Sequence, residues 1–546
     1  MRKLAALVAA AAVVVGIAGT STAQGVVPRN GQTARATGYT PPAINWTDCT
    51  DPTLQHYGAQ CGQLVVPMSY ADPTGRKIKL AVSRVLHSTP DSDYQGVMLV
   101  NPGGPGGSGL IYSILGAVSP SLNGAGDAYD WIGFDPRGVG SSTPSISCNQ
   151  HYFHADRVPY VPSTGAIVDR WVTRSKSYAA DCAHAPGHAL LNHVKTTDTV
   201  KDMESLRKAL GQTQINYYGF SYGTYLGSVY ASLHPNRVRR FIFDGTVDPR
   251  GVWYKDNEDQ DVAFERTINI YFGWLAKYHK VYHVGATRAD VRHRYYATLH
   301  KLDRHAARGV LGGDELTDVF LSAGYYVYGW EDIAKAWSMY LNKGKPGALI
   351  NLYQGANPQT AGADNGFAMY LGTQCTDARW PQSQARLNHD NARIYRHHRF
   401  ETWANAWFNG PCPYWHFGNA RPVTIDGSKV TSNILMIGET FDAATPFSGS
   451  LQVRSLFPSA SLIEGRNGTT HAGSLSGVTC TDDSIAAYLQ DGTVPTRQPG
   501  RRSDKLCPHV PRPNPTAAAP SARMSATRAD ALARLRAGLV DAQLHE

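Results

Sequence analysis

One pentapeptide, Gly-Phe-Ser-Tyr-Gly at residues 219–223, constrains the fold of this chain more than any other feature. It follows an apolar run at 215–219 that is typical of a strand, and it precedes apolar residues at helical spacing over 222–233. Its glycines permit a turn that is too tight for larger side chains, and such a turn holds the central serine in a strained, accessible position. The pattern therefore predicts a strand, a sharp turn that carries Ser221, and a helix.

Further apolar runs lie on both sides of this motif and alternate with helical patterns. Strands are predicted at 63–68, 78–86, 96–100, 129–134, 238–243, 433–437 and 460–463, and helices at 197–210, 222–233 and 483–489. Such alternation is typical of a mostly parallel sheet with helices on both faces. Between residues 250 and 421 the pattern is instead helical and rich in aromatic side chains. We expect a large helical cap, inserted between the two sequence halves of an α/β core.

The remaining segments differ in composition from the core and the cap. Two basic residues, an apolar run at 4–19 and small residues near Ala23 predict a signal peptide over 1–23. Because the apolar run is shorter than the roughly 20 residues of a membrane-spanning helix, we expect a secreted, extracellular protein without stable membrane association. The segments that follow are expected to be an extended N-terminal arm (24–60), the first half of the core (61–249), the cap (250–425), the second half of the core (426–498) and a Pro/Ala/Arg-rich tail (499–546).

The tail also carries much of the positive charge of the chain. Of the net charge of +9, Arg2 and Lys3 supply +2 and residues 499–546 supply +4, which leaves +3 for residues 24–498. So small and dispersed a charge does not favour a nucleic-acid partner. Leu532, Leu535 and Leu539 lie at helical spacing near the end of the tail, and this helix either docks on the body or is a removable segment.

Eight cysteines, an even number behind a signal peptide, predict an oxidising compartment and up to four disulfides. On the order of 100 pairings exist, but the order along the chain favours neighbours, since short loops close at low entropic cost. The favoured pairs are Cys49–Cys61, Cys148–Cys182, Cys375–Cys412 and Cys480–Cys507. A zinc site requires closely set ligands such as Cys-x-x-Cys, which are absent, and no third ligand accompanies His279 and His283. We expect no metal and no other cofactor.

A serine hydroxyl is a weak nucleophile until a base takes its proton, so an acid and a histidine are expected after Ser221 in that order. Asp442 follows the predicted strand at 433–437, and His471 lies in the loop after the strand at 460–463. Three other carboxylates compete for the role of the acid, namely Glu439, Asp244 and Asp248. His471 has no competitor in the core, because the later histidines lie in the tail.

The same chemistry requires backbone donors for an oxyanion. The glycine-rich segment 101–109 follows the predicted strand at 96–100, where such folds place one donor, and we expect Gly104 to supply it. Tyr222, the residue after the serine, is expected to supply the second donor. The segment lacks the Gly-Lys-Ser/Thr ending and the Gly-x-Gly-x-x-Gly spacing of phosphate-binding loops.

These motifs together resemble a known family. The segments 101–106, 135–142 and 219–223, followed by Asp442 and His471, are similar to those of the secreted tripeptidyl aminopeptidases in the prolyl-aminopeptidase branch of α/β-hydrolases. The resemblance covers most of residues 45–507. It implies an α/β-hydrolase fold with a helical cap, and release of short peptides, three residues long, from free N-termini of peptides or proteins through an acyl-enzyme on Ser221. It also implies a structural role for Asp135 and Arg137.

The chain departs from the family pattern at two places. The family often carries a further cysteine pair early in the cap, where this chain reads Trp274-Leu275-Ala276. The arginine-rich tail is the second departure. The first departure lies in the cap and the second in the tail. The departure in the cap bears most on the length of the peptide that the resemblance implies is released.

An aminopeptidase holds a cationic amino group, which favours a carboxylate in a partly desolvated pocket. The predicted cap has an acidic cluster over 256–265 and a further aspartate, and we name Glu258 and Asp377 as candidates. The alternative is that the cluster is the solvated start of a helix. A secreted carboxylesterase or lipase with the same triad is the alternative function, because fold and triad do not determine which acyl group is cleaved.

Overall fold

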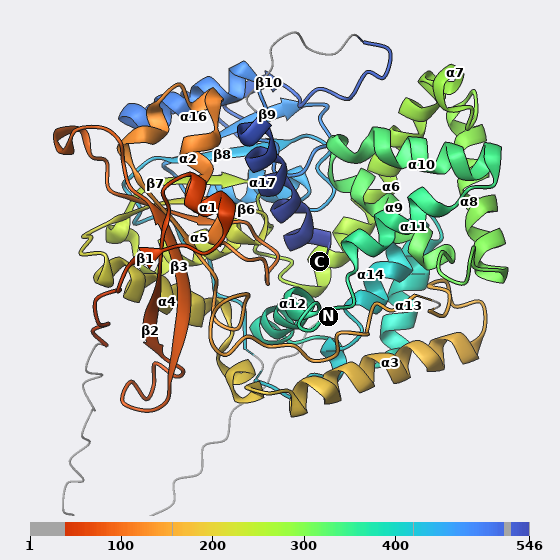
Figure 1. Cartoon of the computed structure of the whole chain (residues 1–546), viewed down its shortest axis with the longest axis horizontal. Helices are drawn as coiled ribbons and strands as arrows, with labels where there is room; N and C mark the ends of the chain where they lie inside the picture. Colours follow the sequence, from red (N-terminus) through yellow and green to blue (C-terminus); the bar gives the residue numbers. More distant parts are fainter. Residues whose placement is uncertain (1–38, 156, 419, 518–525, 545–546) are drawn as a thin grey trace, which may run out of the picture. The chain divides into compact units, whose positions relative to one another are not determined.

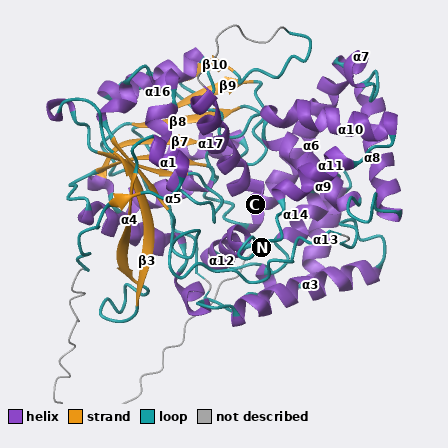
Figure 2. Cartoon of the chain, in the orientation of Figure 1, coloured by secondary structure: helices purple, strands orange, loops and turns teal. Residues whose placement is uncertain are grey.

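The computed structural model describes residues 39–155, 157–418, 420–517 and 526–544, so the predicted signal peptide lies outside the described residues. The described strands form one sheet (Figures 1 and 2). In spatial order they are β1 (Thr47–Asp48), β2 (Gln60–Pro67), β3 (Lys77–Val85), β5 (Asp130–Phe134), β4 (Val97–Asn101), β6 (Ile215–Phe220), β7 (Val238–Asp244), β8 (Ile434–Glu439), β9 (Ala460–Arg466) and β10 (Lys505–Pro508).

The sheet is antiparallel at one end and parallel over the rest. β1, β2, β3 and β5 pair antiparallel in that order, whereas all pairs from β5 to β10 are parallel. Every residue of β4, β6 and β8 is buried, as expected for parallel strands with helices on both faces. The predicted α/β-hydrolase architecture is confirmed.

Side-chain alternation along the strands separates two layers of core. Leu99 of β4 packs with α4 (Thr196–Ala209) and α5 (Tyr222–Leu233) on one face of the sheet. Met98 and Val100 point to the other face, which α2 (Leu115–Val118) and α16 (Thr479–Asp491) cover. The short helix α1 (Pro52–His56) also belongs to this second face, whereas α15 (Phe447–Leu456) packs on the first.

Nine described α-helices lie between β7 and β8, and they form the predicted cap. They are α6 (Tyr254–Lys277), α7 (His279–Tyr282), α8 (Arg288–Arg304), α9 (Gly313–Tyr325), α10 (Trp330–Lys343), α11 (Gly347–Ala356), α12 (Asn365–Asp377), α13 (Gln384–Tyr395) and α14 (Thr402–Phe408). Most of them share an aromatic core of their own that includes Phe320, Trp330 and Trp337. No helix in the described part of the chain has the length and apolar content to span a bilayer.

One long helix of the first half of the chain, α3 (Gly165–His184), packs against the cap and was not predicted from the sequence. Its Trp171 ring stacks on Trp407 of α14, with ring centroids 5.7 Å apart. Its Tyr178 hydroxyl donates a hydrogen bond of 2.9 Å to Asp364 at the start of α12. Sequence order placed residues 165–184 in the core, but Trp171 and Tyr178 also contact residues of the cap that are more than 180 positions later in the sequence.

The segments expected as an arm and a tail both contribute regular structure. Residues 24–60 contain β1, α1 and the start of β2, and β10 of the tail pairs in parallel with β9. These strands are too short for a periodic signal. The last helix, α17 (Ala526–Leu544), docks on the body, where Tyr112 donates a hydrogen bond of 2.9 Å to the carbonyl oxygen of Leu535. Leu535 is buried in that contact.

The four disulfides of the structure are those that the sequence order favoured. They join Cys49 to Cys61, Cys148 to Cys182, Cys375 to Cys412 and Cys480 to Cys507. The last of them ties β10 to α16, and the third ties the end of α12 to the segment after α14.

Candidate active site

Ser221 occupies the predicted turn between β6 and α5. Its φ of 51° and ψ of −123° lie in a region that residues with side chains rarely adopt, so the backbone is strained. The turn is too tight for a side chain at Gly219, where a Cβ would lie 2.5 Å from the carbonyl oxygen of Gly223. The N–H of Ser221 donates a hydrogen bond of 3.0 Å to the carbonyl oxygen of Asp244, which holds the turn against the end of β7.

Asp442 and His471 follow the carboxyl ends of β8 and β9, at the same edge of the sheet as Ser221. Nδ1 of His471 lies 2.7 Å from Oδ2 of Asp442, and both side chains are buried. Asp442 also accepts hydrogen bonds from the N–H (2.9 Å) and the hydroxyl (3.0 Å) of Thr445. The other side of the imidazole packs on Gly245, where a Cβ would lie 2.7 Å from Cε1 of His471.

The other carboxylates that the sequence offered as the acid have different partners. Glu439 accepts from the N–H groups of Thr470 (2.7 Å) and Val510 (2.6 Å), and burial raises its pKa to about 8. Asp244 accepts from the N–H of Ser474, and burial raises its pKa to about 6. Both carboxylates therefore brace the loop that carries His471. Asp248 forms an ion pair with Arg250.

The glycine-rich segment lies beside the turn, because Asn101 at the end of β4 is in register with Gly219. Gly103 and Gly104 have φ of 102° and 100°, and a Cβ on Gly103 would lie 2.9 Å from Cβ of Ser221. Gly104, Ser221 and Tyr222 line one pocket, which we call the Ser221 pocket. The predicted donors and the serine are thus brought together.

The family profile described as alpha/beta hydrolase fold matches residues 96–463, from the start of β4 through most of β9. The chain belongs to the α/β-hydrolase family. This hydrolase is 38% identical over 484 residues to a tripeptidyl aminopeptidase of Streptomyces coelicolor, a match that covers 86% of this chain and 87% of the relative. It is 28% identical over 476 residues to serine protease Hip1 of Mycobacterium tuberculosis, which covers 83% of this chain and 89% of the relative. A solved proline iminopeptidase of Mycobacterium smegmatis aligns with 15% identity and a TM-score of 0.34, over 79% of this chain and 98% of the other.

The Ser221 pocket of this hydrolase is acidic on the side of the cap. Asp256, Asp259 and Gln260 of α6 line it, together with Asp248 and with Gln374 of α12. Burial raises the pKa of Asp256 well above its ordinary value, and the neighbouring Asp248 and Asp259 add to the effect. Positions 256, 259 and 260 follow the i, i+3, i+4 spacing of one helix face. That spacing was the signal in the sequence by which these residues could have been found.

The two carboxylates named from the sequence for the substrate amine do not line the Ser221 pocket. Glu258 lines a neighbouring pocket and lies 3.6 Å from Arg393. Asp377 accepts hydrogen bonds from the N–H (2.8 Å) and the hydroxyl (2.6 Å) of Thr196. Burial raises the pKa of Asp377 to about 6. Glu258 fails to reach Ser221 because it lies on a different face of α6 from Asp256.

Asp135 and Arg137 lie in a loop after β5 and have structural contacts, as the resemblance implied. Asp135 accepts from the hydroxyl of Ser108 (2.6 Å) and from the N–H of Ser141 (2.7 Å). Arg137 pairs with Asp202 of α4. Among the described residues, no group of three or more histidines, cysteines and carboxylates is placed to hold a metal ion.

Proposed function

We propose that this hydrolase is a secreted serine aminopeptidase, which releases short peptides, three residues long, from the free N-termini of peptides and proteins. Ser221 is the nucleophile, His471 the base and Asp442 the acid that orients the base. The observation that carries the proposal is the buried pair of Asp442 and His471, 2.7 Å apart, at the sheet edge where Ser221 occupies a strained turn.

In the proposed reaction, Oγ of Ser221 attacks the scissile carbonyl carbon while Nε2 of His471 takes the hydroxyl proton. The bond between Nδ1 and Asp442 orients the imidazole and stabilises its charged form. The N–H groups of Gly104 and Tyr222 donate to the oxyanion of the tetrahedral intermediate. His471 then protonates the leaving amine. In the second half of the reaction, His471 takes a proton from a water molecule that attacks the acyl-enzyme, and it gives this proton to Oγ of Ser221 as the ester bond breaks.

Relatives and electrostatics support a peptide substrate. The relative from Streptomyces coelicolor is named a tripeptidyl aminopeptidase, and the one from Mycobacterium tuberculosis a serine protease. The carboxylates around the Ser221 pocket favour a cationic substrate such as a peptide with a free amino terminus. The signal peptide predicted at 1–23 and the four disulfides support export to an oxidising compartment.

A carboxylesterase is the second candidate, because a relative named carboxylesterase B is 28% identical over 472 residues. Among the described residues, Asp248 and Asp259 pair with Arg250 and Lys255, so Asp256 is the carboxyl group of the Ser221 pocket that a neutral ester would leave without a cation. The acidic lining therefore favours the peptidase.

Purified protein tests the proposal with free tripeptidyl amides, their N-acetylated forms and simple esters, with the released products identified by mass. We expect tripeptide release from the free amides and slow turnover of the acetylated ones. Ser221→Ala should reduce turnover by roughly 10⁵-fold or more with the fold unchanged. Equal rates on free and acetylated peptides, or turnover of esters alone, would favour the esterase.

A further inference from the structure

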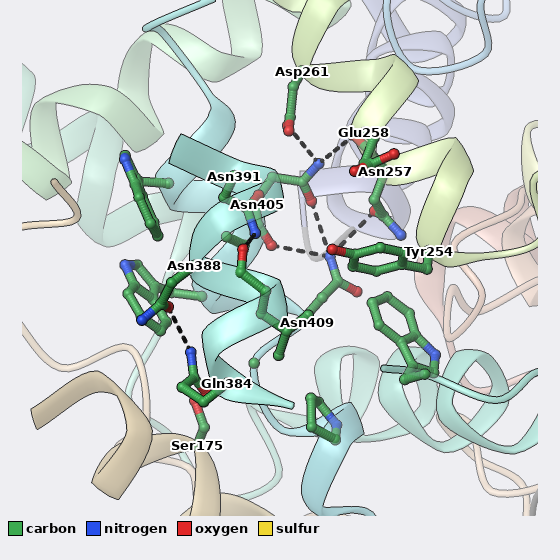
Figure 3. Close-up of a pocket in the computed structure, with 17 residues that line it drawn as sticks. Ser175, Tyr254, Asn257, Glu258, Asp261, Gln384, Asn388, Asn391, Asn405 and Asn409 are labelled. Atoms are coloured by element: carbon green, nitrogen blue, oxygen red, sulfur yellow. Dashed lines mark hydrogen bonds between the residues drawn. The ribbon is translucent and has the colours of Figure 1, made fainter. Parts of the chain in front are cut away.

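A second pocket of the cap adjoins the Ser221 pocket, and it is lined mainly by amide and aromatic side chains (Figure 3). The amides come from α6, α13 and α14 and the turn after α14, and they are Asn257, Gln384, Asn388, Asn391, Asn405 and Asn409. We call it the amide pocket. Amide groups both donate and accept hydrogen bonds, as the peptide groups of a substrate require.

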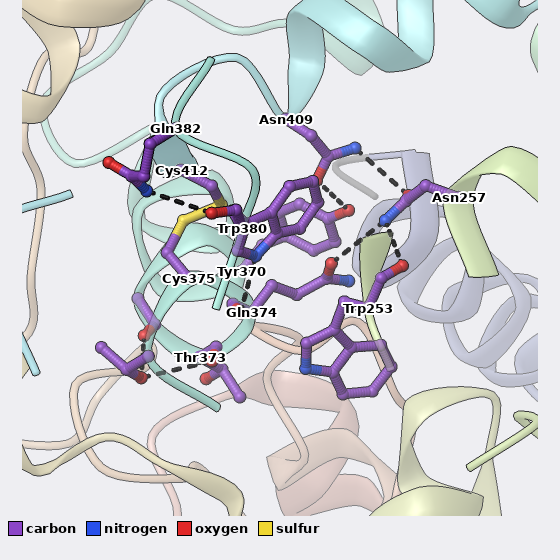
Figure 4. Close-up of a disulfide and its surroundings, with 12 residues drawn as sticks. Trp253, Asn257, Tyr370, Thr373, Gln374, Cys375, Trp380, Gln382, Asn409 and Cys412 are labelled. Atoms are coloured by element: carbon purple, nitrogen blue, oxygen red, sulfur yellow. Dashed lines mark hydrogen bonds between the residues drawn. A yellow bond between two sulfur atoms is a disulfide. The ribbon is translucent and has the colours of Figure 1, made fainter. Parts of the chain in front are cut away.

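The two pockets meet at Asn257, which lines both of them. Its side chain donates to the carbonyl oxygen of Trp253 (3.0 Å) and accepts from the side chain of Asn409 (3.2 Å). The Asn257 side chain also donates a hydrogen bond of 3.5 Å to Oε1 of Gln374, which lines the Ser221 pocket (Figure 4). The disulfide between Cys375 and Cys412 joins the segments that carry Gln374 and Asn409, so the boundary between the pockets is held in place.

Asp261 lies in the wall of the amide pocket as a buried carboxylate without a counter-ion. It is 2% exposed, and its Oδ1 accepts a hydrogen bond of 3.0 Å from the side chain of Asn405. Among the described residues, no lysine, arginine or histidine forms an ion pair with it. Burial raises the pKa of Asp261 well above its ordinary value, so the charged carboxylate is favoured only when a cation reaches it.

The charged groups around Asp261 are mostly negative, with Lys255 of the same helix as the exception, and aromatic side chains line the same pocket. Glu258 and Asp259 of the same helix raise the pKa of Asp261 further, beyond the larger effect of burial, and Glu401 lies close enough for Asp261 to raise its pKa as well. Trp403 and Trp407, whose rings lie 5.6 Å apart, line the same pocket. At the opposite end, the buried hydroxyl of Ser175 has no hydrogen-bond partner among the described residues.

Helix geometry sets the distance between Asn257, which lines both pockets, and Asp261 in the amide pocket. Asn257 and Asp261 are four residues apart on α6, which corresponds to about 6 Å along the helix axis. An extended peptide covers that distance with roughly two residues. The amino-terminal residues of a substrate therefore fit between Asn257 and Asp261, while the scissile bond lies in the Ser221 pocket.

We propose that the amide pocket binds the amino-terminal residue of the substrate, with Asp261 as the counter-ion of its ammonium group. This inference rests on the proposed function. The ammonium donates to Oδ2 of Asp261, while Oδ1 keeps its bond to Asn405. Asn257 marks the point where the substrate passes from one pocket to the other, and the distance from Ser221 to Asp261 determines how many residues are released.

The test compares Asp261→Asn with the wild type on a free tripeptidyl amide, its N-acetylated form and p-nitrophenyl acetate. Asp332→Asn, which removes an exposed carboxylate of α10, is the matched control. We expect wild type and control to prefer the free peptide by hundreds-fold, because an acetylated end leaves a buried carboxylate unpaired. In Asp261→Asn this preference should fall to within about tenfold, mainly through KM for the free peptide, with ester turnover unchanged.

An unchanged preference in Asp261→Asn would overturn the inference, and so would loss of the preference in Asp256→Asn alone. If Asp261→Asn fails to fold by circular dichroism, Asp261→Ser is measured in the same way against the same outcomes. Cleavage of peptides with no dependence on Asp261 contradicts this inference alone. Failure of the wild type to cleave any peptide, with the ester still turned over through Ser221, contradicts the proposed function instead.

Discussion

The carboxylate of Asp377 accepts both hydrogen bonds that Thr196 can donate, from its N–H at 2.8 Å and from its hydroxyl at 2.6 Å. The same hydroxyl lies 2.8 Å from the hydroxyl of Tyr222. Asp377 at the end of α12 thus connects the cap to the start of α4 and, through Thr196, to the residue after the nucleophile.

This contact predicts that Asp377 affects stability and not the choice of substrate. Because burial raises its pKa to about 6, the folded protein holds a proton that the unfolded chain loses near pH 4. The contribution of Asp377 to the free energy of unfolding is therefore fully present below about pH 4. It falls by roughly 3 kcal/mol as the pH rises to about 6. In Asp377→Asn this loss should be absent, which urea unfolding between pH 4 and pH 7 can measure. A changed preference between free and acetylated peptides would contradict the assignment.

Asp442→Asn should lower kcat by about 10⁴-fold with little change in KM, because the amide favours the wrong tautomer of His471. Steady-state kinetics on a free tripeptidyl amide measure this loss. Glu439→Gln is the comparison, since Glu439 bonds to the N–H groups of Thr470 and Val510 and not to the imidazole. A larger loss of kcat in Glu439→Gln than in Asp442→Asn would show that the acid is assigned incorrectly.

Arg137 and Asp202 form a buried ion pair, with Nη2 of Arg137 2.6 Å from the carboxylate and Nε 2.7 Å from it. Arg137→Ala leaves Asp202 buried and unpaired, so unfolding free energy should fall by about 3–5 kcal/mol. Replacing both residues with apolar ones, as in Arg137→Met with Asp202→Leu, should recover part of this loss. The folded variants should keep kcat/KM within about threefold, since neither residue lines the Ser221 pocket. A large fall in kcat with unchanged stability would contradict the structural role.

The disulfide between Cys375 and Cys412 closes a loop with a sequence separation of 37 residues and lies next to Gln374 of the Ser221 pocket. Replacing both cysteines by alanine should cost about 3–4 kcal/mol of unfolding free energy and raise KM for peptides. The matched control is the pair Cys49 and Cys61, which is remote from both pockets and should affect stability alone. Thermal unfolding and kinetics on both variants separate the two effects. Equal changes in KM in the two double variants would mean that the Ser221 pocket does not depend on the disulfide between Cys375 and Cys412.

The nucleophile turn, the mostly parallel sheet and the order of serine, acid and histidine could all be predicted from the sequence. These features depend on local signals, since a glycine on each side of Ser221 permits the strained turn and each buried strand is an apolar run. The disulfide pairs were also predictable, because neighbours in sequence close short loops. By contrast, the sequence left four candidates for the acid, and only the packing shows which of them contacts His471.

Tertiary structure alone decided which acidic side chains of the cap face which pocket. Asp256 and Glu258 are two residues apart, yet the rotation of α6 against the core directs one to the Ser221 pocket and the other to the amide pocket. Tertiary packing likewise decided the position of α3, whose Trp171 stacks on Trp407 of α14, the last helix of the cap. These contacts join residues that are far apart in the sequence, and no local pattern of residues records which of them will meet when the helices pack.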